Sequence, residues 1–312
     1  MDLSIVVPTH SRPDHLARLL GSLEAATAPG LSWEVIVIEN AVSFGVAPAL
    51  ARALDRPALP LRRFAEPAQG KSRALNLGVR RARGEFVAFL DDDVIARPDY
   101  LAGVRETIRT LPHSVYGGRV RAVWPAPPPD WVTGGGPVTI SRGPIVAHDH
   151  GDHARAYDAG MALPIGCNFF CRLDLFARCG LFDVRLGPGS GKGHMGGEET
   201  DLLHRFQAAG ETIFYAPRVA VDHPVDPERM TKRYFRFRHF CAGRAAPYLV
   251  SARFPSILGV PRFLYRRLAR AAGRAALLRA AGRRLPAFDR ELEVCELLGA
   301  MYEYRRVSRG AA

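Results

Sequence analysis

Short apolar runs alternate with amphipathic stretches over the first 110 residues of the chain. Residues 3–7, 33–38 and 86–90 are rich in β-branched and aromatic side chains, the composition of strands buried on both faces. Between the first two runs, residues 15–23 place four leucines at helical spacing on one face. Because strands alternate with helices, we predict an α/β protein with a mostly parallel central sheet and right-handed crossovers.

The pattern changes after residue 110, where the loops are longer. Further strands are predicted at residues 114–124, 164–172, 212–215 and 218–223. Pro217 falls in the turn between the last two of these strands. Two segments rich in proline and glycine, 125–160 and 187–197, are predicted to be loops that shape a site. The second loop leads into a helix that begins at Glu198.

The last part of the chain is helical and strongly basic. Residues 229–312 carry 19 Lys plus Arg against 5 Asp plus Glu, a charge of +14, whereas the whole chain carries +12. We therefore predict an α/β domain over residues 1–228, with halves at about 1–110 and 111–228. A basic helical extension follows over residues 229–312.

The arginine-rich part of this extension has two interpretations. Residues 261–284 contain eight arginines and no acidic residue, with Leu, Phe and Ala between them. Such a helix can lie in the interface of an anionic membrane, or it can be the solvated face of a helical hairpin that packs on the domain. Nucleic acid is not expected as a partner, because no nucleic-acid-binding motif accompanies the charge.

Simple patterns also predict the compartment. No window of 18 unbroken apolar residues exists in the sequence, so no spanning helix is expected. The chain opens on a strand without a basic leader, so we expect a cytoplasmic protein, peripheral on the inner face of the membrane if the extension binds lipid. The five cysteines form no CxxC pair and are expected to be reduced thiols.

Three consecutive carboxylates, Asp91, Asp92 and Asp93, follow the apolar run at residues 86–90. Adjacent carboxylates repel one another, and a hard divalent cation relieves that repulsion through oxygen ligands. In open α/β sheets, ligands bind beyond the carboxyl ends of the strands, which is where this triplet lies. The triplet by itself predicts either a divalent-metal site or an acidic turn before the next helix.

Other charged residues lie at predicted strand ends and helix starts. Glu39 follows the second strand, where α/β folds hydrogen-bond a nucleoside, or it is a turn residue. Lys71 and Arg73 fall in the first turn of a helix, which suits a phosphate or pyrophosphate. Glu198 and Glu199 also fall in a first helical turn, where they are either an acidic cap or a general base.

Histidines raise a separate question about metal binding. His223 ends a predicted strand and is either a metal ligand or a structural residue. Residues 148–153 contain three histidines, but no predicted strand or helix fixes their geometry. We favour a mobile loop lining a site over a metal centre in that segment.

Seven short motifs occur in an order that resembles the family 2 glycosyltransferases of the GT-A fold. They are Ile5–Thr9, Glu34–Asn40, Gly70–Gly78, Gly84–Asp93, Gly166–Phe170, Gly180–Asp183 and Glu198–Leu202. The resemblance covers about residues 3–248. It implies that residues 1–228 are a GT-A catalytic domain, with a nucleotide-binding half at about 1–110 and an acceptor-binding half at 111–228.

The resemblance also implies roles for individual residues. Contacts with the nucleotide sugar are implied for Pro8, Thr9, Arg12, Glu39, Lys71, Arg73, Asp91 and Asp92. Metal ligands are implied at Asp91, Asp93 and His223. The catalytic base is implied at Glu199, where the family usually has an aspartate, or at its neighbour Glu198. Trp131 and Asn168 are expected on the acceptor side.

The implied reaction is inverting transfer of a sugar from a nucleoside-diphosphate sugar to an acceptor hydroxyl. The donor is expected to be a UDP-sugar in the first place, or a GDP- or dTDP-sugar, with Mn²⁺ or Mg²⁺. The acceptor is expected to be a glycan, a lipid-linked glycan or a natural product, as in the synthesis of cell-envelope polysaccharide. The alternative is a degenerate, non-catalytic transferase domain that docks on a membrane or on another protein.

Overall fold

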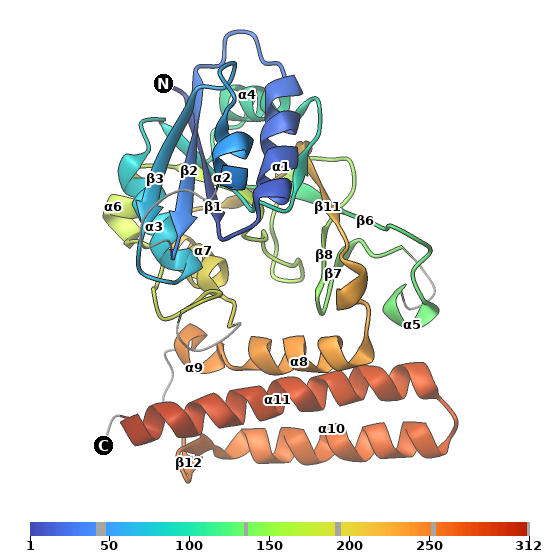
Figure 1. Cartoon of the computed structure of the whole chain (residues 1–312). Coiled ribbons are helices and arrows are strands. Elements are labelled where there is room, and N and C mark those ends of the chain that lie inside the picture. The colour runs from blue at the N-terminus through green and yellow to red at the C-terminus, as the bar shows by residue number, and fades with distance from the viewer. Residues whose placement is uncertain (42–47, 134–136, 191–194, 251–253, 311–312) are drawn as a thin grey trace.

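A mixed β-sheet lies at the centre of the N-terminal part of the chain (Figure 1). The computed structural model describes residues 1–41, 48–133, 137–190, 195–250 and 254–310. The strand order is β3-β2-β1-β4-β10-β6-β11-β5. These strands are β1 (Leu3–Thr9), β2 (Trp33–Asn40), β3 (Leu61–Glu66), β4 (Phe86–Leu90), β5 (Ile95–Ala96), β6 (Val115–Val123), β10 (Asn168–Arg172) and β11 (Ile213–Pro224).

The sheet is mostly parallel, which confirms the predicted fold class. Strands β3, β2, β1 and β4 pair in parallel, and so do β6 and β11. The antiparallel strand β10 lies between β4 and β6 and joins these two parallel groups. The short strand β5 pairs antiparallel with β11 at the edge.

Helices cover both faces of the sheet. Helices α1 (Pro13–Ala25) and α4 (Tyr100–Thr110) pack on one face, and α2 (Pro48–Leu54) lies beside α1. Helices α3 (Lys71–Arg81), α6 (Leu175–Cys179) and α7 (Glu198–Ala208) pack on the other face. Phe86, Ala88 and Leu90 of β4 join the first core, and Val87 and Phe89 join the second. Because both faces are covered, the strand is a continuous apolar run.

Strand β11 differs from its prediction as two short strands. It is one strand from Ile213 to Pro224, with a register shift between Ala216 and Ala220 where it pairs with β6. Pro217 lies in this irregularity, because a proline has no N–H to donate to the ladder. The proline therefore marks a bulge inside the strand and does not end it.

The segment predicted as a loop over residues 125–160 contains short regular elements in its described part. They are α5 (Asp130–Thr133), β7 (Ile140–Arg142), β8 (Ile145–His148) and β9 (Arg155–Ala156). Strand β8 pairs with β6 and β9 pairs with β11, so the segment extends the sheet. Residues 134–136 of this segment and residues 191–194 of the glycine-rich loop lie outside the described residues.

The C-terminal helices form a separate layer under the sheet (Figure 1). After η1 (Pro227–Arg229), the chain forms α8 (Lys232–Gly243) and α9 (Ala246–Leu249), then α10 (Arg262–Ala280) and α11 (Arg284–Gly310). A two-stranded hairpin, β12 (Ser256–Ile257) and β13 (Val260–Pro261), precedes α10. Helix α11 lies between α8 and α10. None of the helices in the described residues is long and apolar enough to cross a membrane.

Two glycines allow α8 and α11 to approach closely. A Cβ atom on Gly243 would lie 1.9 Å from the carbonyl oxygen of Glu296 in α11. A Cβ atom on Gly299 would lie 1.9 Å from the carbonyl oxygen of Phe240 in α8. The helix backbones therefore touch at this crossing, and any side chain there would push them apart.

Candidate active site

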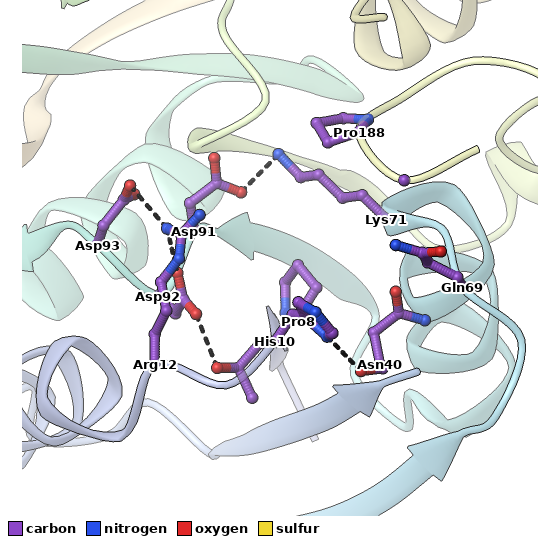
Figure 2. A pocket seen from close by; sticks show the side chains of 12 residues that line it. Pro8, His10, Arg12, Asn40, Gln69, Lys71, Asp91, Asp92, Asp93 and Pro188 are labelled. Carbon is purple, nitrogen blue, oxygen red and sulfur yellow. Dashed lines mark hydrogen bonds and ion pairs between the residues drawn. The ribbon is translucent and has the colours of Figure 1, made fainter. Parts of the chain in front are cut away.

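A cavity of about 490 Å³ opens where β1, β2 and β4 end (Figure 2). This is the edge at which parallel α/β sheets bind ligands. The cavity is lined by Pro8, Thr9, His10, Arg12, Asn40, Gln69, Lys71, Asp91, Asp92, Asp93, Pro188 and Gly189. The structure therefore brings together seven of the residues predicted for the nucleotide sugar and the metal, from three separate segments of the chain.

Asp92 fixes the loop that follows β1 against the end of β4. Thr9 donates a hydrogen bond from Oγ1 to Asp92 Oδ2 at 2.7 Å, and Arg12 donates from Nη1 to Oδ1 at 3.2 Å. Burial raises the pKa of Asp92 to about 6, although the bond from Thr9 and the charge of Arg12 act in the opposite direction. Asp92 thus positions Thr9 and Arg12 at the cavity wall.

Lys71 bridges two carboxylates from different elements. It begins α3, and its Nζ lies 2.6 Å from Asp91 Oδ1 and 3.5 Å from Glu198 Oε1. Burial alone would lower the pKa of Lys71, but the charges of Asp91, Glu198 and Glu199 outweigh burial and raise it. Lys71 therefore stays positively charged at the start of a helix, an arrangement that suits a phosphate group.

Asp93 is surrounded by positive or titratable groups. Its Oδ2 lies 3.2 Å from Arg12 Nη1 and 3.5 Å from Arg229 Nη2, and its Oδ1 lies 3.6 Å from His223 Nε2. Burial acts to raise the pKa of Asp93, but the charges of His223, Arg229 and Arg12 outweigh it and lower the pKa. Asp93 is therefore ionised at neutral pH, and its Oδ1 is buried without a hydrogen-bond partner.

The donor set around Asp93 fits a divalent cation that is shared with a substrate. Within the described residues, no group of three or more His, Cys, Asp or Glu side chains is gathered closely enough to hold a metal by itself. The partnerless Oδ1 of Asp93, the adjacent Nε2 of His223 and the carboxylate of Asp91 would be the protein's ligands. Mg²⁺ is commonly bound in this way, by one or two carboxylates that leave positions for substrate phosphates and water.

The two consecutive glutamates occupy different environments in the first turn of α7. Glu198 is 3% exposed, interacts with Lys71, and has a buried Oε2 without a hydrogen-bond partner. Glu199 is half-buried and lies beside Gly166. Burial, together with the charge of Glu198, raises the pKa of Glu199 to about 8. The pair therefore contains one carboxylate held by a lysine and one whose pKa lies near working pH.

Two of the predicted nucleotide-binding residues do not line the cavity. The side chain of Glu39 is 1% exposed and is ion-paired with Arg63 Nε of β3, so it points into the sheet edge. The next residue, Asn40, reaches the cavity in its place. Arg73 is exposed in the first turn of α3, where its aliphatic part lies near Gly70.

Asn168 and Trp131, which were predicted on the acceptor side, make structural contacts in the fold. Asn168 is wholly buried at the start of β10, and its Nδ2 donates to the carbonyl oxygens of Arg119 and Val219, both at 2.9 Å. It therefore bridges β6 and β11 inside the sheet. Trp131 packs edge-on against Phe235 and Phe288, so it joins α5 to the C-terminal helices.

The histidine-rich segment also lies apart from the cavity. His148 is fully buried and hydrogen-bonds through Nε2 to the Tyr157 hydroxyl at 2.5 Å. Burial lowers the pKa of His148 to about 3, so the imidazole is neutral. His150 packs edge-on against Tyr157 and Tyr215. The segment is thus part of an aromatic cluster, and its residues are not among those that line this cavity.

Several residues at the cavity were not predicted from the sequence. They are His10, Asn40 and Gln69, with Arg229 behind Asp93, whereas Pro188 and Gly189 belong to the loop predicted to shape a site. Asn40 holds the loop before α3, because its Oδ1 accepts from Gly70 N at 2.9 Å and its Nδ2 donates to the Ala68 carbonyl at 2.9 Å. Its position as the last residue of β2 was the available signal. Arg229 carries no comparable signal among the many arginines of the extension.

Two known proteins are similar in sequence to most of this chain. The chain is 30% identical over 247 residues to the succinoglycan biosynthesis protein ExoM of Rhizobium meliloti, which covers 78% of this chain and 74% of ExoM. It is 24% identical over 253 residues to a glucosyl-dolichyl phosphate glucuronosyltransferase of Haloferax volcanii, covering 78% of this chain and 75% of that protein.

Solved structures show the same fold. The mannosyltransferase PcManGT from Pyrobaculum calidifontis, in complex with GDP-Man and Mn²⁺, matches with a TM-score of 0.53 and 18% identity, over 99% of this chain and 75% of that one. The S. aureus protein TarS in complex with UDP-GlcNAc matches with a TM-score of 0.54 and 15% identity, over 100% of this chain and 92% of that one.

The fold and the carboxylates at its strand ends define a glycosyltransferase of the GT-A type. The model of glycosyl transferase family 2 matches residues 4–177 of this sequence. The chain belongs to glycosyl transferase family 2.

Proposed function

We propose that the protein transfers a sugar, with inversion, from a nucleoside-diphosphate sugar to a hydroxyl group of a glycan or lipid-linked glycan. The observation that carries this proposal is Asp93, whose buried and partnerless Oδ1 faces His223 at the cavity wall. A buried unpaired oxygen costs about 1–3 kcal/mol, and a bound cation would remove that cost.

Each residue at the cavity has a role in this proposal. Thr9, Asn40 and Lys71 border the space for the nucleoside and its diphosphate. Asp91, Asp93 and His223 hold a divalent cation, which supplies charge stabilisation to the leaving diphosphate. UDP-, GDP- and dTDP-sugars are the candidate donors.

We place the catalytic base at Glu199 and give Glu198 a positioning role. Glu198 is occupied by Lys71, whereas Glu199 is half-buried and has a pKa raised to about 8. A general base works best when its pKa lies near the working pH. In this assignment, Glu199 takes the proton of the acceptor hydroxyl as that oxygen attacks the anomeric carbon from the face opposite the diphosphate.

The competing function is a degenerate, non-catalytic domain that only docks on a membrane or on another protein. The intact triplet at residues 91–93 and the Glu198–Glu199 pair argue against it. A protein without catalytic function has no need for a raised pKa at Glu199 or for a partnerless oxygen on Asp93.

We also propose that α10 and the β12–β13 hairpin rest on an anionic membrane surface. Leu258 at the hairpin turn is 74% exposed and Leu277 on α10 is 72% exposed. Exposed arginines lie between them along α10 at positions 262, 266, 267, 270 and 274. Apolar side chains among arginines are typical of a helix that lies in a lipid interface.

The proposed reaction can be tested with a panel of UDP-, GDP- and dTDP-sugars and with Mn²⁺ or Mg²⁺. We expect one nucleotide series to raise the melting temperature of the protein and to be slowly hydrolysed or transferred. Asp93→Ala should abolish the metal-dependent stabilisation. The matched control is Asp222→Ala, which removes a partly exposed carboxylate paired with Arg97. A wild-type protein that no nucleotide stabilises would contradict the proposal.

A further inference from the structure

Arg229 is the residue through which the C-terminal extension reaches the cavity. It ends η1, the short turn between strand β11 of the central sheet and helix α8. Its Nη2 lies 3.5 Å from Asp93 Oδ2, and its Nε lies 3.9 Å from Asp226 Oδ2. The turn is held in place because the Arg229 N–H donates to the Asp226 carbonyl at 3.0 Å.

The guanidinium group of Arg229 makes few polar interactions for a group that is mostly buried. Its side chain is only 23% exposed, yet within the described residues the group donates no hydrogen bond and makes only the two long ion pairs with Asp93 and Asp226. Arg12 approaches the same oxygen of Asp93 more closely, at 3.2 Å, and forms a hydrogen bond there. A guanidinium carries five N–H donors in a planar fork that matches carboxylates and phosphates. Arg229 therefore has donors to spare beside the cavity.

The charge balance of the site indicates the kind of group that would use these donors. Carboxylates outnumber the cationic side chains there among the described residues. The carboxylates are Asp91, Asp92, Asp93, Glu198 and Asp226, and the cationic partners are Lys71, Arg12 and Arg229. A divalent cation on Asp93 would offset this excess and would compete with the two arginines for that carboxylate, which would free their N–H donors for another anion. A diphosphate supplies that anion and offers oxygens to a guanidinium fork.

We propose that Arg229 binds the diphosphate of the sugar nucleotide, so that the C-terminal extension completes the donor site. This inference rests on the proposed function, because it requires a nucleoside-diphosphate donor. When a cation occupies Asp93, the Arg229 guanidinium turns from that carboxylate to the diphosphate oxygens. Arg229 then stabilises the charge that the departing nucleoside diphosphate gains.

Binding of nucleotides to the full-length chain tests this role without any measurement of turnover. The affinities of UDP, GDP and dTDP, and of UMP, GMP and dTMP, are measured by calorimetry with Mn²⁺ for the wild type, Arg229→Gln, Arg229→Lys and Arg233→Gln. Arg233 is an exposed arginine in the first turn of α8, so its substitution removes the same charge from the neighbouring surface.

We expect Arg229→Gln to weaken binding of the diphosphate by about tenfold or more, which is the scale of a lost charged hydrogen bond. Binding of the monophosphate should change less than about twofold, because the guanidinium acts on the diphosphate charge. Arg229→Lys should fall between Arg229→Gln and the wild type, since it keeps the charge and loses the fork. Arg233→Gln should bind like the wild type.

The outcomes separate this inference from the function on which it rests. If the wild type binds none of the three diphosphates, the proposed function fails and the inference fails with it. If the wild type binds one diphosphate and Arg229→Gln binds it equally well, only the inference is overturned. Equal losses of affinity for the diphosphate and the monophosphate would show that Arg229 merely shapes the turn. If Arg229→Gln does not fold, the same comparison of affinities is made with Arg229→Lys.

Discussion

Charge is arranged in opposite ways at the cavity and on the outer helix α10. At the cavity, each of the three consecutive aspartates has a cationic partner within 3.2 Å. On α10, the arginines at positions 262, 266, 267, 270 and 274 are exposed and have no acidic partner in the described part of the chain. Paired and buried charge fixes the positions of individual atoms, whereas a solvated row of one sign acts as a field over a surface.

The largest effect is expected at the cavity, from Glu199→Gln. Turnover should fall by roughly 10²- to 10⁴-fold, the usual contribution of a general base. The wild-type rate should rise with pH up to about 8 and then level off, because burial raises the pKa of Glu199 to about 8 and only the deprotonated form accepts a proton. Initial rates between pH 6 and 9 check both points.

Glu198→Gln is the matched control for this substitution. It should lower turnover less, and it should weaken nucleotide binding because Lys71 loses a partner. Glu199→Gln should keep the stabilisation by nucleotide and metal. If Glu198→Gln is the more damaging change to turnover and removes the rise with pH, the base is Glu198.

The second-largest effect is expected at Glu303. This buried and paired carboxylate lies among the C-terminal helices, so buried ion pairs are not confined to the cavity. Glu303 of α11 is fully buried and accepts hydrogen bonds from Arg244 Nε at 3.0 Å and from the Tyr248 hydroxyl at 2.9 Å. Glu303→Ala leaves Arg244 without its partner, so we expect a loss of about 3–5 kcal/mol in the free energy of unfolding. Urea unfolding measures the loss, with half-exposed Glu296→Ala as the control.

The third prediction tests whether the positive charge of α10 binds the protein to a lipid surface. Replacing Arg266, Arg267 and Arg270 by Gln should weaken binding to anionic vesicles by about 1 kcal/mol per residue. Sedimentation with phosphatidylglycerol vesicles measures this, and nucleotide binding should be unchanged. The control removes three exposed arginines elsewhere, at positions 52, 80 and 178. Equal weakening by both triple variants would mean that net charge, and not the α10 face, determines the binding.

The smallest effect concerns how α10 and α11 are held on the rest of the protein. Gly299→Ala places a methyl group against the Phe240 carbonyl, so it should destabilise the protein by about 1–3 kcal/mol. Gly273→Ala is the control, because a Cβ there meets nothing within 4 Å, and it should stabilise the protein by up to about 1 kcal/mol. Thermal unfolding compares the two. Similar melting temperatures would show that the helices do not depend on this close contact.

Features that are local in the sequence were predicted well. Strand β4 and its aspartates could be read directly, since a strand covered on both faces is a continuous apolar run and its polar end is a contiguous triplet. The same holds for α3 and α7, which begin at Lys71 and Glu198 as predicted.

Features that depend on distant contacts were not predictable. Asn168 interrupts an apolar run, and this polar residue was therefore predicted to belong to a site. In the structure, its side-chain amide donates hydrogen bonds to backbone carbonyl groups next to the β11 bulge. Glu39 follows its strand as predicted, and only the three-dimensional structure shows Arg63 of the neighbouring strand covering it. Arg229 resembles every other arginine of the extension until the fold places it beside Asp93.

The order of the C-terminal helices affects how far the rest of the protein would lie from a lipid surface that α10 binds. Helix α11 separates α8 from α10, and packed helices lie about 8–10 Å apart, so α10 lies up to about 20 Å beyond α8. If α10 rests on lipid, this stack acts as a spacer that keeps the catalytic domain off the surface. An acceptor anchored in the same lipid would have to extend across that gap, which favours a growing glycan over a first sugar attached directly to its lipid carrier.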